Sequence, residues 1–584
     1  MRLTIPITFA LAVLACSEAP EGTGGSSTTD LTTTGLTTTE PTTTEPTTTA
    51  PTTTSTTEPE ELCVAGEVGP CYSGPPGTVD IGLCVAGMAT CLPDGSGFGP
   101  CEGEITPQAE DCEASPDENC DGLAVCPFGA SLWSRQFGDA QADYVNGLAV
   151  GSDDSVAIVG HYYGNFEFDR GVILPDGEAF DSYVSMLNTA GDHLWTLPIE
   201  GVGAPENSRA LAAAVCIDGA GAIYVSGTFD STIAFGGASL ENNKPVPGAF
   251  LAKLGPDGEY LWAKGFAPDD DDNDERIGAT LWHLACDPAG GVATAGIVSS
   301  AKQIDLGGGP LWGYGPPGIY GDALVAGFDG DGKHLWSRRF RRPAQGAQAL
   351  ARNTKGDVAI CGQLAFGDTI DFGGGPRMGL PRDLFIAQFD SKGAHLWSET
   401  WGGDDSSITC GALAFDAQDA LLVAGTFEGE FNLGGANLKT QDMVDSSFTS
   451  DIFLAKFAGG VHQWSLAAGL AVDGIFFPTG LATDSSDAIY LYGQYADAAP
   501  SGIGLPLPAS NGTALVLAKY TSDGQPLSAG AYDSIGENYS GGIAINSEDH
   551  VLLGGYFTST IDFGSGSHAE AGTGDAFVAK VQIK

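Results

Sequence analysis

Three oxygen-bearing side chains alternate near the end of a cysteine-rich stretch. They are Asp117, Asn119 and Asp121, and Gly122 follows them. This spacing matches the first part of a calcium-binding loop, in which alternate side chains present oxygen ligands to a hard cation and glycine makes the sharp turn. Phe128 stands where such a loop places its bidentate glutamate. The pattern predicts a Ca²⁺ site and no other cofactor, and a solvated turn held by disulfides is the alternative.

A second candidate site combines an acidic stretch with an aromatic one. The aromatic stretch contains Trp312, Tyr314 and Tyr320. Aromatic faces stack on sugar rings or on apolar peptide groups, and carboxylates bind hydroxyl groups or a cation. We therefore predict a ligand-binding site here, with two solvated loops as the plainer alternative. The acidic members are Asp269, Asp270, Asp271, Asp272 and Asp274.

The sequence lacks the motifs of the common hydrolases and nucleotide-binding proteins. It contains no G-x-S-x-G elbow, no H-E-x-x-H helix and no P-loop. Four histidines lie just before a recurrent Leu-Trp landmark, and a residue that returns at the same place in a repeat is more typical of packing than of catalysis. We therefore name no catalytic residue. The four histidines are His193, His334, His395 and His462.

Eight cysteines fall within residues 62–128. An even number of cysteines in a short exported stretch that is rich in glycine and proline predicts a disulfide framework, although the spacing leaves its connectivity open. A zinc site is the weaker alternative because the stretch has no C-x-x-C pair and no histidine. The eight are Cys63, Cys71, Cys84, Cys91, Cys101, Cys112, Cys120 and Cys126.

Four further cysteines follow in the rest of the chain. Cys216 and Cys286 occupy equivalent points in consecutive repeats, which is typical of small buried apolar residues. A bond between Cys361 and Cys410 stays open as an alternative to free thiols.

The N-terminal residues predict export and a lipid anchor. Residues 1–15 have a basic start at Arg2 and an apolar run, as in a signal peptide. The sequence Val-Leu-Ala before Cys16 resembles a bacterial lipobox, which implies that Cys16 becomes the lipidated N-terminus; ordinary signal cleavage is the alternative. Ser17 in place of aspartate implies transport to the outer membrane, and we expect the cell surface. A transmembrane helix needs a longer apolar run.

Residues 16–61 consist mainly of threonine, proline, glycine and glutamate. Such a composition cannot bury a core, so this linker should be disordered and extended. Chains that contain proline reach about 3 Å per residue, so the linker would hold the following domains on the order of 100 Å from the membrane.

Residues 129–584 contain seven copies of one unit. Each copy has two apolar runs joined by a polar turn, then an aromatic-Gly patch, and finally a strand, a glycine turn and Leu-Trp. Four short strands at a period of about sixty residues predict propeller blades. The fold class is therefore all-β, a seven-bladed β-propeller. The Leu-Trp position holds Trp133, Trp195, Trp262, Trp336, Trp397, Trp464 and, in the sixth repeat, Leu527.

These landmarks resemble the SBBP-type seven-bladed β-propeller repeat of secreted proteins of Gram-negative bacteria, over residues 129–584. The resemblance implies a fold that carries no catalytic motif. Residues 110–122 resemble the Cys- and Asp-rich metal-binding motif of bacterial surface proteins. The sixth repeat departs most, because residues 498–504 replace the aromatic-Gly patch.

The chain is strongly acidic. It has 24 Lys and Arg against 74 Asp and Glu, which gives a formal charge of −50. Nucleic acid and anionic lipid should therefore be repelled. We expect contact with a membrane through the lipid anchor only, and a monomer.

The order of strands in a blade makes two structural predictions. The loop leading into the first strand and the loop between the second and third strands lie on one face, so the acidic and aromatic stretches should be neighbours. Residues 132–137 form a surplus last strand, and the final repeat lacks one. We therefore predict that residues 132–137 pair beside residues 577–581 and close the ring, which removes an unpaired edge.

These features together predict a surface lipoprotein whose propeller binds a protein or a carbohydrate. One alternative is a propeller hydrolase or lyase that acts on an extracellular polymer. The other is a purely structural envelope protein. Ionisable side chains gathered at one mouth of the channel would favour the enzyme, and a decorated rim would favour binding.

Overall fold

The computed structural model divides the chain into two units, residues 1–126 and 127–584. The described residues are all-β and contain no helix, and none of their elements is a helix that could cross a membrane. They are 63–74, 79, 83–107, 130–168, 172–202, 209–244, 246–269, 278–299, 303–313, 321–341, 346–365, 368–403, 406–440, 450–468, 475–496, 507, 512–532, 536–564 and 566–583.

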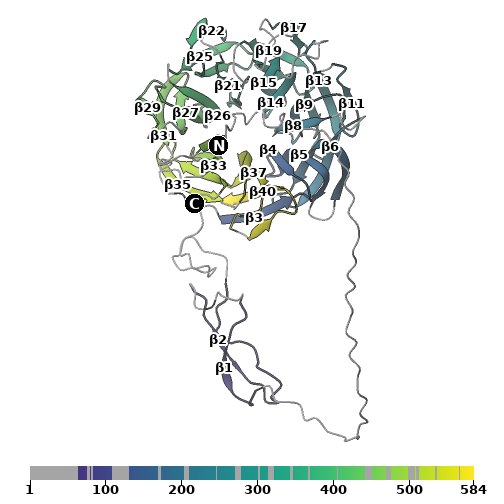
Figure 1. Ribbon diagram of the computed structural model, residues 1–584, viewed down its shortest axis with the longest axis vertical. Helices are drawn as coiled ribbons and strands as arrows, with labels where there is room; N and C mark the ends of the chain where they lie inside the picture. Colours follow the sequence, from purple (N-terminus) through teal and green to yellow (C-terminus); the bar gives the residue numbers. More distant parts are fainter. Residues whose placement is uncertain are drawn as a thin grey trace, which may run out of the picture. The chain divides into compact units, whose positions relative to one another are not determined.

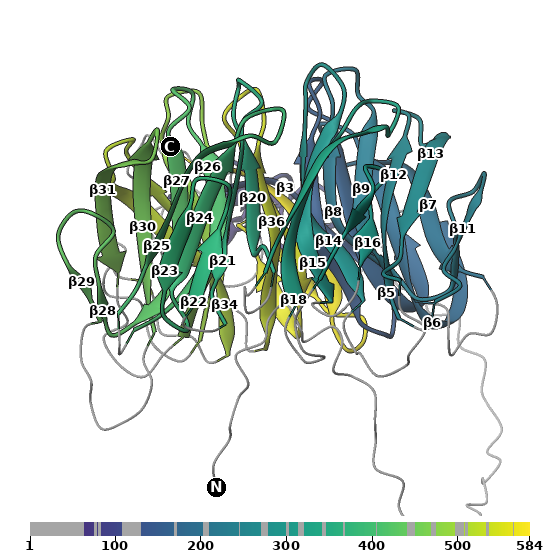
Figure 2. The ribbon, with the colours of Figure 1, turned by 90° about the horizontal axis from the view of Figure 1, so that it is seen from above.

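The second unit is a ring of seven antiparallel blades (Figures 1 and 2). Blade 1 consists of β4 (Asp143–Val150), β5 (Val156–Phe168), β6 (Val172–Leu187) and β7 (His193–Gly201), and blade 2 of β8 (Ala210–Ile217), β9 (Ile223–Phe229), β12 (Gly248–Leu254) and β13 (Tyr260–Phe266). Blade 3 consists of β14 (Ala279–Cys286), β15 (Val292–Ser299), β18 (Gly321–Phe328) and β19 (His334–Phe340), and blade 4 of β20 (Ala349–Arg352), β21 (Val358–Gln363), β24 (Leu384–Phe389) and β25 (His395–Trp401).

Blades 5 to 7 complete the ring. Blade 5 consists of β26 (Ser407–Phe415), β27 (Leu421–Glu428), β30 (Asp451–Ala458) and β31 (Val461–Ala468). Blade 6 consists of β32 (Ile475–Thr483), β33 (Ile489–Ala496), β34 (Thr513–Tyr520) and β35 (Pro526–Tyr532). Blade 7 consists of β36 (Asn538–Ile545), β37 (Val551–Phe557), β40 (Asp575–Gln582) and β3 (Ala130–Phe137).

The middle strands of each blade are apolar on both sides because a neighbouring blade covers each side. All eight residues of β15 are buried, and so are all eight of β18. The first strand of each blade lies innermost, and these seven strands contact one another in sequence around the ring, β36 meeting β4. The core is thus a set of apolar layers between blades, as in other propellers.

The ring closes as the sequence predicts. Strand β3 pairs with β40, and Trp133, Arg135 and Phe137 lie opposite Lys580, Val578 and Ala576. The order of the closing blade is β3-β40-β37-β36. The outermost strand of the last blade therefore comes from the beginning of the propeller sequence.

In blades 2, 3, 4, 5 and 7 the aromatic-Gly patch forms a small hairpin outside the main blade, whereas in blade 1 the equivalent residues 166–168 are part of β5. In blade 2 this hairpin joins the sheet of blade 1, because β10 pairs with β7 and makes that sheet six-stranded. The hairpins are β10 (Thr232–Ala234) with β11 (Ser239–Glu241), β16 (Ile304–Asp305) with β17 (Pro310–Leu311), β22 (Asp368–Asp371) with β23 (Pro376–Gly379), β28 (Glu430–Phe431) with β29 (Leu438–Lys439), and β38 (Thr560–Asp562) with β39 (Ser567–Ala569).

The landmark tryptophans join successive blades. Trp336 of blade 3 covers Gly393, where an added Cβ would lie 2.5 Å from the indole, and its Nε1 donates to the Ser391 carbonyl at 3.0 Å. Trp133, Trp195, Trp262 and Trp464 donate in the same way to the turns of the blades that follow them. This contact explains why Trp and the turn glycine recur together.

The assignment of Leu527 to the tryptophan position is wrong by one residue. Ser528 lies opposite Lys519, as Trp262 lies opposite Lys253. Blade 7 receives its fourth strand from the start of the propeller, so its third and fourth strands share no turn. Blade 6 consequently has no turn on which a tryptophan could stack.

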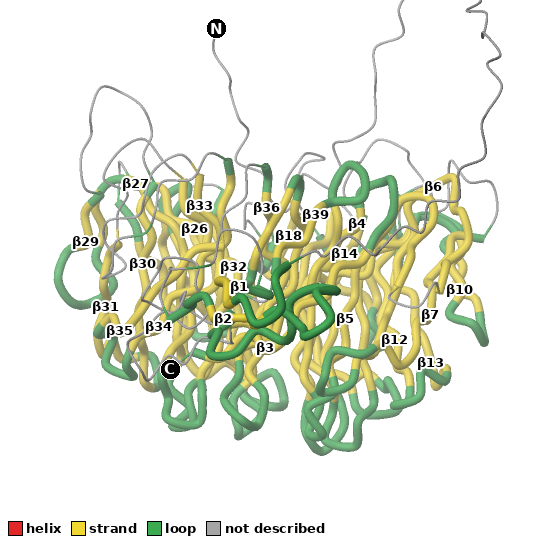
Figure 3. Tube along the Cα trace, turned by 90° about the horizontal axis from the view of Figure 1, so that it is seen from below, coloured by secondary structure: helices red, strands yellow, loops and turns green. Residues whose placement is uncertain are grey.

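Short turns between the first and second strands link neighbouring blades through hydrogen bonds; Figure 3 shows short green turns at the ends of the yellow strands. Four of these turns place an aspartate at φ values of 60–62°, a region that aspartate tolerates better than most residues. Each carboxylate accepts hydrogen bonds from the turn of the preceding blade, for example from Ser547 N to Asp154 Oδ1 at 2.9 Å. The four are Asp154, Asp419, Asp487 and Asp549.

Both cysteine pairs of the propeller are disulfides. Cys216 of β8 is bonded to Cys286 of β14, which corrects the expectation that they are separate small apolar residues. Their equivalent positions on adjacent innermost strands are what bring them together, with 5.6 Å between Cα atoms. Cys361 and Cys410 join blades 4 and 5.

The first unit holds a small Cys-rich module. Strand β1 (Val68–Cys71) pairs with β2 (Gly87–Thr90). Disulfides join Cys63 to Cys91 and Cys71 to Cys101, as the disulfide framework predicts. Cys84 is also disulfide-bonded. Cys112, Cys120 and Cys126 lie outside the described residues.

Candidate functional site

One residue of the predicted blade 3 site, Asp269, contacts the connection between β15 and β18, which also contains Trp312. Asp269 N donates to the Gln303 carbonyl at 2.9 Å, and Gln303 Nε2 donates to Asp269 Oδ2 at 2.9 Å. Asp269 also forms an ion pair with Lys244 at 2.8 Å, so this carboxylate already has a cationic partner. Trp312 is 57% exposed.

The other members of that predicted site lie outside the described residues. They are Asp270, Asp271, Asp272, Asp274, Tyr314 and Tyr320, and the predicted calcium ligands Asp117, Asn119 and Asp121 lie outside them as well. Within the part of the chain that the structure describes, no three acidic, histidine or cysteine side chains are grouped as metal ligands.

The recurrent histidines fix the small hairpins to the outer strands. His334 Nε2 lies 2.9 Å from Ser337 Oγ, and a Cβ on Gly308 of the adjacent hairpin would lie 2.2 Å from the His334 ring. His395 and His462 make the same contacts with their own hairpins, and His193 bonds Thr196. Burial lowers the pKa of His334, His395 and His462, so the rings are neutral packing elements.

A cluster that the sequence analysis missed lies where blades 7 and 1 meet. Tyr144 of β4 stacks on His161 of β5 and on Tyr556 of β37, with ring centroids 4.3 Å apart in both contacts. Tyr539 of β36 tilts against Tyr556 at 5.7 Å, and Tyr163 meets His161 edge-on at 6.1 Å. We call these five residues the seam array.

The strand register explains why the rings meet. Tyr144 lies opposite His161 in blade 1, and Tyr539 lies opposite Tyr556 in blade 7, so the same cross-strand position is aromatic in both blades. These pairs lie near the start of the innermost strand, toward the face that carries the longer loops. The corresponding positions of blade 2 are Leu211 and Thr228, and those of blade 5 are Thr409 and Thr426.

Hydrogen bonds set the protonation state of His161. Asn146 Nδ2 donates to the Ala212 carbonyl at 2.8 Å, which fixes the orientation of the amide, and it also lies 3.0 Å from His161 Nδ1. Nδ1 therefore accepts, and the proton of the neutral ring is on Nε2. Burial lowers the pKa of His161 to about 3, so the ring stays neutral at ordinary pH.

Burial also favours the uncharged form of three phenols of the array. Burial raises the pKa of Tyr144, Tyr539 and Tyr556 above the ordinary value. Tyr556 Oη donates to the Thr573 carbonyl at 2.9 Å. Tyr144, Tyr163 and Tyr539 are half-buried, so part of each ring remains accessible. Both faces of the Tyr144 ring are covered, and its hydroxyl interacts with that of Tyr556.

A polar strip continues from the array along the innermost strands. Ser540, next to Tyr539, accepts a hydrogen bond from Thr479 of blade 6 at 2.6 Å, and its backbone N–H donates to Gln494 Oε1 at 2.9 Å. The arrangement offers aromatic edges and uncharged donors and acceptors over three adjacent blades. Such a surface suits a ligand with many hydroxyl groups and no charge.

No protein-family model matches the chain, and no curated protein matches it. Several solved structures match the chain at low identity and low TM-score. Polysaccharide lyase Uly1 is 11% identical, with a TM-score of 0.40, over 78% of this chain and 100% of its own. A protein of unknown function from Dyadobacter fermentans is 10% identical, with a TM-score of 0.36, over 78% and 100%. An ulvan lyase bound to a GlcA–Rha3S saccharide is 11% identical, with a TM-score of 0.31, over 69% and 97%.

Proposed function

We propose that this protein is an exported, lipid-anchored binding protein whose propeller recognises an uncharged carbohydrate at the seam array. The observation that carries the proposal is the stacking of Tyr144 between His161 and Tyr556 across the junction of blades 7 and 1. Aromatic ring edges and neutral hydrogen-bonding groups together contact the apolar C–H groups and the hydroxyl groups of sugars.

The protonation states favour binding over catalysis. A tyrosine that acts as a general base needs a pKa near the working pH, whereas burial raises the pKa of Tyr144 and Tyr556. His161, with a pKa of about 3, is a poor proton acceptor at neutral pH. The array is therefore suited to donate hydrogen bonds to a ligand that it binds and releases without a chemical reaction.

Net charge narrows the ligand class further. A chain with a formal charge of −50 repels polyanions, so an acidic polysaccharide would be drawn less strongly than a neutral one. The array contains no lysine or arginine that would offset this repulsion. A neutral polymer fits these conditions best.

The anchor belongs to the same proposal. Lipidation at Cys16 and the linker of residues 16–61 would hold the propeller away from the outer membrane, where it meets extracellular polymers. Cys16→Ser should move the protein from the membrane fraction to the soluble exported fraction. Retention of the variant in membranes would contradict the anchor and leave the binding proposal intact.

The binding proposal is tested on a glycan array with the full chain and matched variants. Tyr144→Phe keeps the stack and removes only the hydroxyl, and Tyr539→Ala removes a ring at the edge. Loss of one hydrogen bond should weaken binding about tenfold. Tyr260→Ala, on an outer strand of blade 2, is the control and should bind normally.

Two outcomes would redirect the proposal. If Trp312→Ala abolishes binding while Tyr144→Phe does not, the ligand binds the blade 3 loops instead. If a bound glycan is cleaved, with new reducing ends or an unsaturated product, the protein is an enzyme. Equal binding by every variant would refute both candidate sites.

A further inference from the structure

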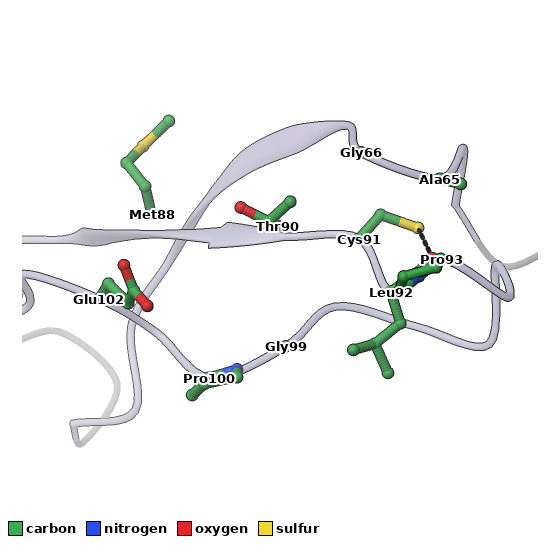
Figure 4. Close-up of a pocket in the computed structure, with 10 residues that line it drawn as sticks. All are labelled: Ala65, Gly66, Met88, Thr90, Cys91, Leu92, Pro93, Gly99, Pro100 and Glu102. Carbon is green, nitrogen blue, oxygen red and sulfur yellow. Dashed lines mark hydrogen bonds between the residues drawn. The ribbon is translucent and has the colours of Figure 1, made fainter.

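A shallow cavity of about 550 Å³ lies on the Cys-rich module (Figure 4). Its apolar walls include Met88, Leu92, Pro93 and Pro100, and Glu102 supplies a carboxylate. Met88 is 50% exposed and Leu92 is 41% exposed. Exposed apolar side chains that gather around one cavity more often belong to an interaction surface than to a surface that stays exposed to solvent.

Strand register shows how this face is built. Along β2, Gly87 and Ala89 are buried whereas Met88 and Thr90 are exposed, and Cys91, which follows the strand, is buried again. Met88 and Glu102 exchange both backbone hydrogen bonds, each at 2.9 Å. Residues paired in this way project to the same side of a sheet. An apolar side chain and a carboxylate therefore stand next to each other at one end of the cavity (Figure 4).

Both edges of β2 are occupied. Strand β1 pairs along one edge, and Met88 and Cys91 bridge to Glu102 and Phe98 along the other. A partner cannot add a strand to an edge that is already paired. Recognition at this face therefore depends on side chains that enter the cavity.

Two disulfides hold the walls in place. Cys91 is part of the lining and is bonded to Cys63, and Cys101 precedes Glu102 and is bonded to Cys71. A wall fixed before binding loses little conformational entropy when a partner docks. The cavity is therefore preformed by covalent bonds rather than by a large apolar core.

Charge decides which partner fits. No lysine, arginine or histidine occurs between Arg2 and Arg135, so every ionised side chain of the module is acidic. We propose that this face binds a cationic, amphipathic peptide segment of a partner protein. An apolar side chain of that segment packs beside Met88 and Leu92, and a neighbouring lysine or arginine pairs with Glu102.

The test uses the full chain and a fluorescent peptide of alternating lysine and leucine as the probe. Binding is followed by anisotropy at low and at high salt, with a glutamate-leucine peptide as the negative control. Met88→Asp should weaken binding about tenfold or more, because it removes apolar contact area. Leu92→Asp is a second variant with the same expectation, and intact disulfides in both are checked by thiol titration.

A matched control separates this face from the charge of the whole protein. Met378 in β23 of the propeller is 80% exposed, and Met378→Asp makes the same chemical change elsewhere. It should leave the affinity unchanged. Glu102→Gln should weaken binding up to about fivefold and flatten its salt dependence. Equal affinities for Met88→Asp and Met378→Asp would overturn the proposal, whether the face is covered by another part of the chain or the peptide binds by charge alone.

Discussion

Ser134 and His568 lie 434 residues apart in the chain, yet Ser134 Oγ is 2.6 Å from His568 Nε2. In blades 3, 4 and 5 the equivalent serine bonds a histidine of its own strand, such as His334 with Ser337. Strand β3 carries no such histidine. The hairpin strand β39 supplies it instead, so the closing blade restores the contact from another part of the chain.

Deletion of residues 132–138 should destabilise the propeller strongly. The deletion removes β3 from β40 and with it Trp133 and Phe137, of which Phe137 is 1% exposed. Loss of one buried aromatic side chain alone costs about 3–5 kcal/mol. The melting temperature should fall markedly, as followed by circular dichroism. Deletion of residues 41–47 from the linker is the control, and an equal effect of both deletions would show that closure contributes nothing.

The propeller disulfides should stabilise the ring by about 2–4 kcal/mol each. The double variants Cys216→Ser with Cys286→Ser, and Cys361→Ser with Cys410→Ser, test this by urea unfolding. Cys71→Ser with Cys101→Ser lies in the other unit and should leave the propeller transition unchanged. Variants that unfold at the same urea concentration as the parent would contradict the stabilising role.

Asp143 should make stability depend on pH. Burial, together with the nearby Asp139 and Asp575 carboxylates, raises the pKa of Asp143 to about 9. The folded protein thus holds a proton that the unfolded chain releases near pH 4. The protonated carboxyl therefore makes its full contribution to the free energy of unfolding below pH 4, and this contribution is lost as the pH rises through 9.

The test of this dependence is Asp143→Asn, which keeps the shape of the side chain and removes its charge. The variant should resist melting better than the parent at pH 8–9 and the same as the parent near pH 4. Asp331→Asn, at an exposed turn, should leave the pH profile unchanged. If the melting temperature of Asp143→Asn depends on pH in the same way as that of the parent, Asp143 is not protonated in the folded protein.

Gly393→Ala should cost more stability than Gly375→Ala. Both glycines have positive φ, 76° and 100°, so alanine strains the backbone at either site. A Cβ at Gly393 would also meet Trp336, whereas Gly375 has open space around it. The difference between the two variants, expected at about 1–3 kcal/mol, reports the contact between blades, and it is measured by urea unfolding. Equal losses would mean that the indole shifts freely.

The ring closure could be predicted from the sequence because it follows from counting strands. When a repeat array has a surplus strand at one end and lacks a strand at the other, the surplus strand must complete the last blade. The bond between Cys216 and Cys286 was missed although its signal was present. Equivalent positions of consecutive innermost strands are neighbours in a propeller, so two cysteines there lie within bonding distance.

The seam array escaped prediction for a related reason. Tyr144 and Tyr539 stand at the two ends of the repeat array, and comparing each repeat with a common pattern does not show that the first and last are neighbours. A search that treats the repeats as a circle would find both. The role of Ser528 depends on strand register, which a landmark such as Leu-Trp fixes only to within a residue.

Every junction between neighbouring blades carries a specific bond as well as apolar packing. An aspartate turn joins four of the junctions, the ion pair of Arg352 with Asp287 joins blades 3 and 4, the Cys216–Cys286 disulfide joins blades 2 and 3, and the pairing of β10 with β7 joins blades 1 and 2. Open arrays of repeats melt from their ends, where a unit has only one neighbour. A ring without an end and without an unlinked junction has no unit at which melting begins more easily, so its cooperativity should extend over the whole circle and calorimetry should register one transition.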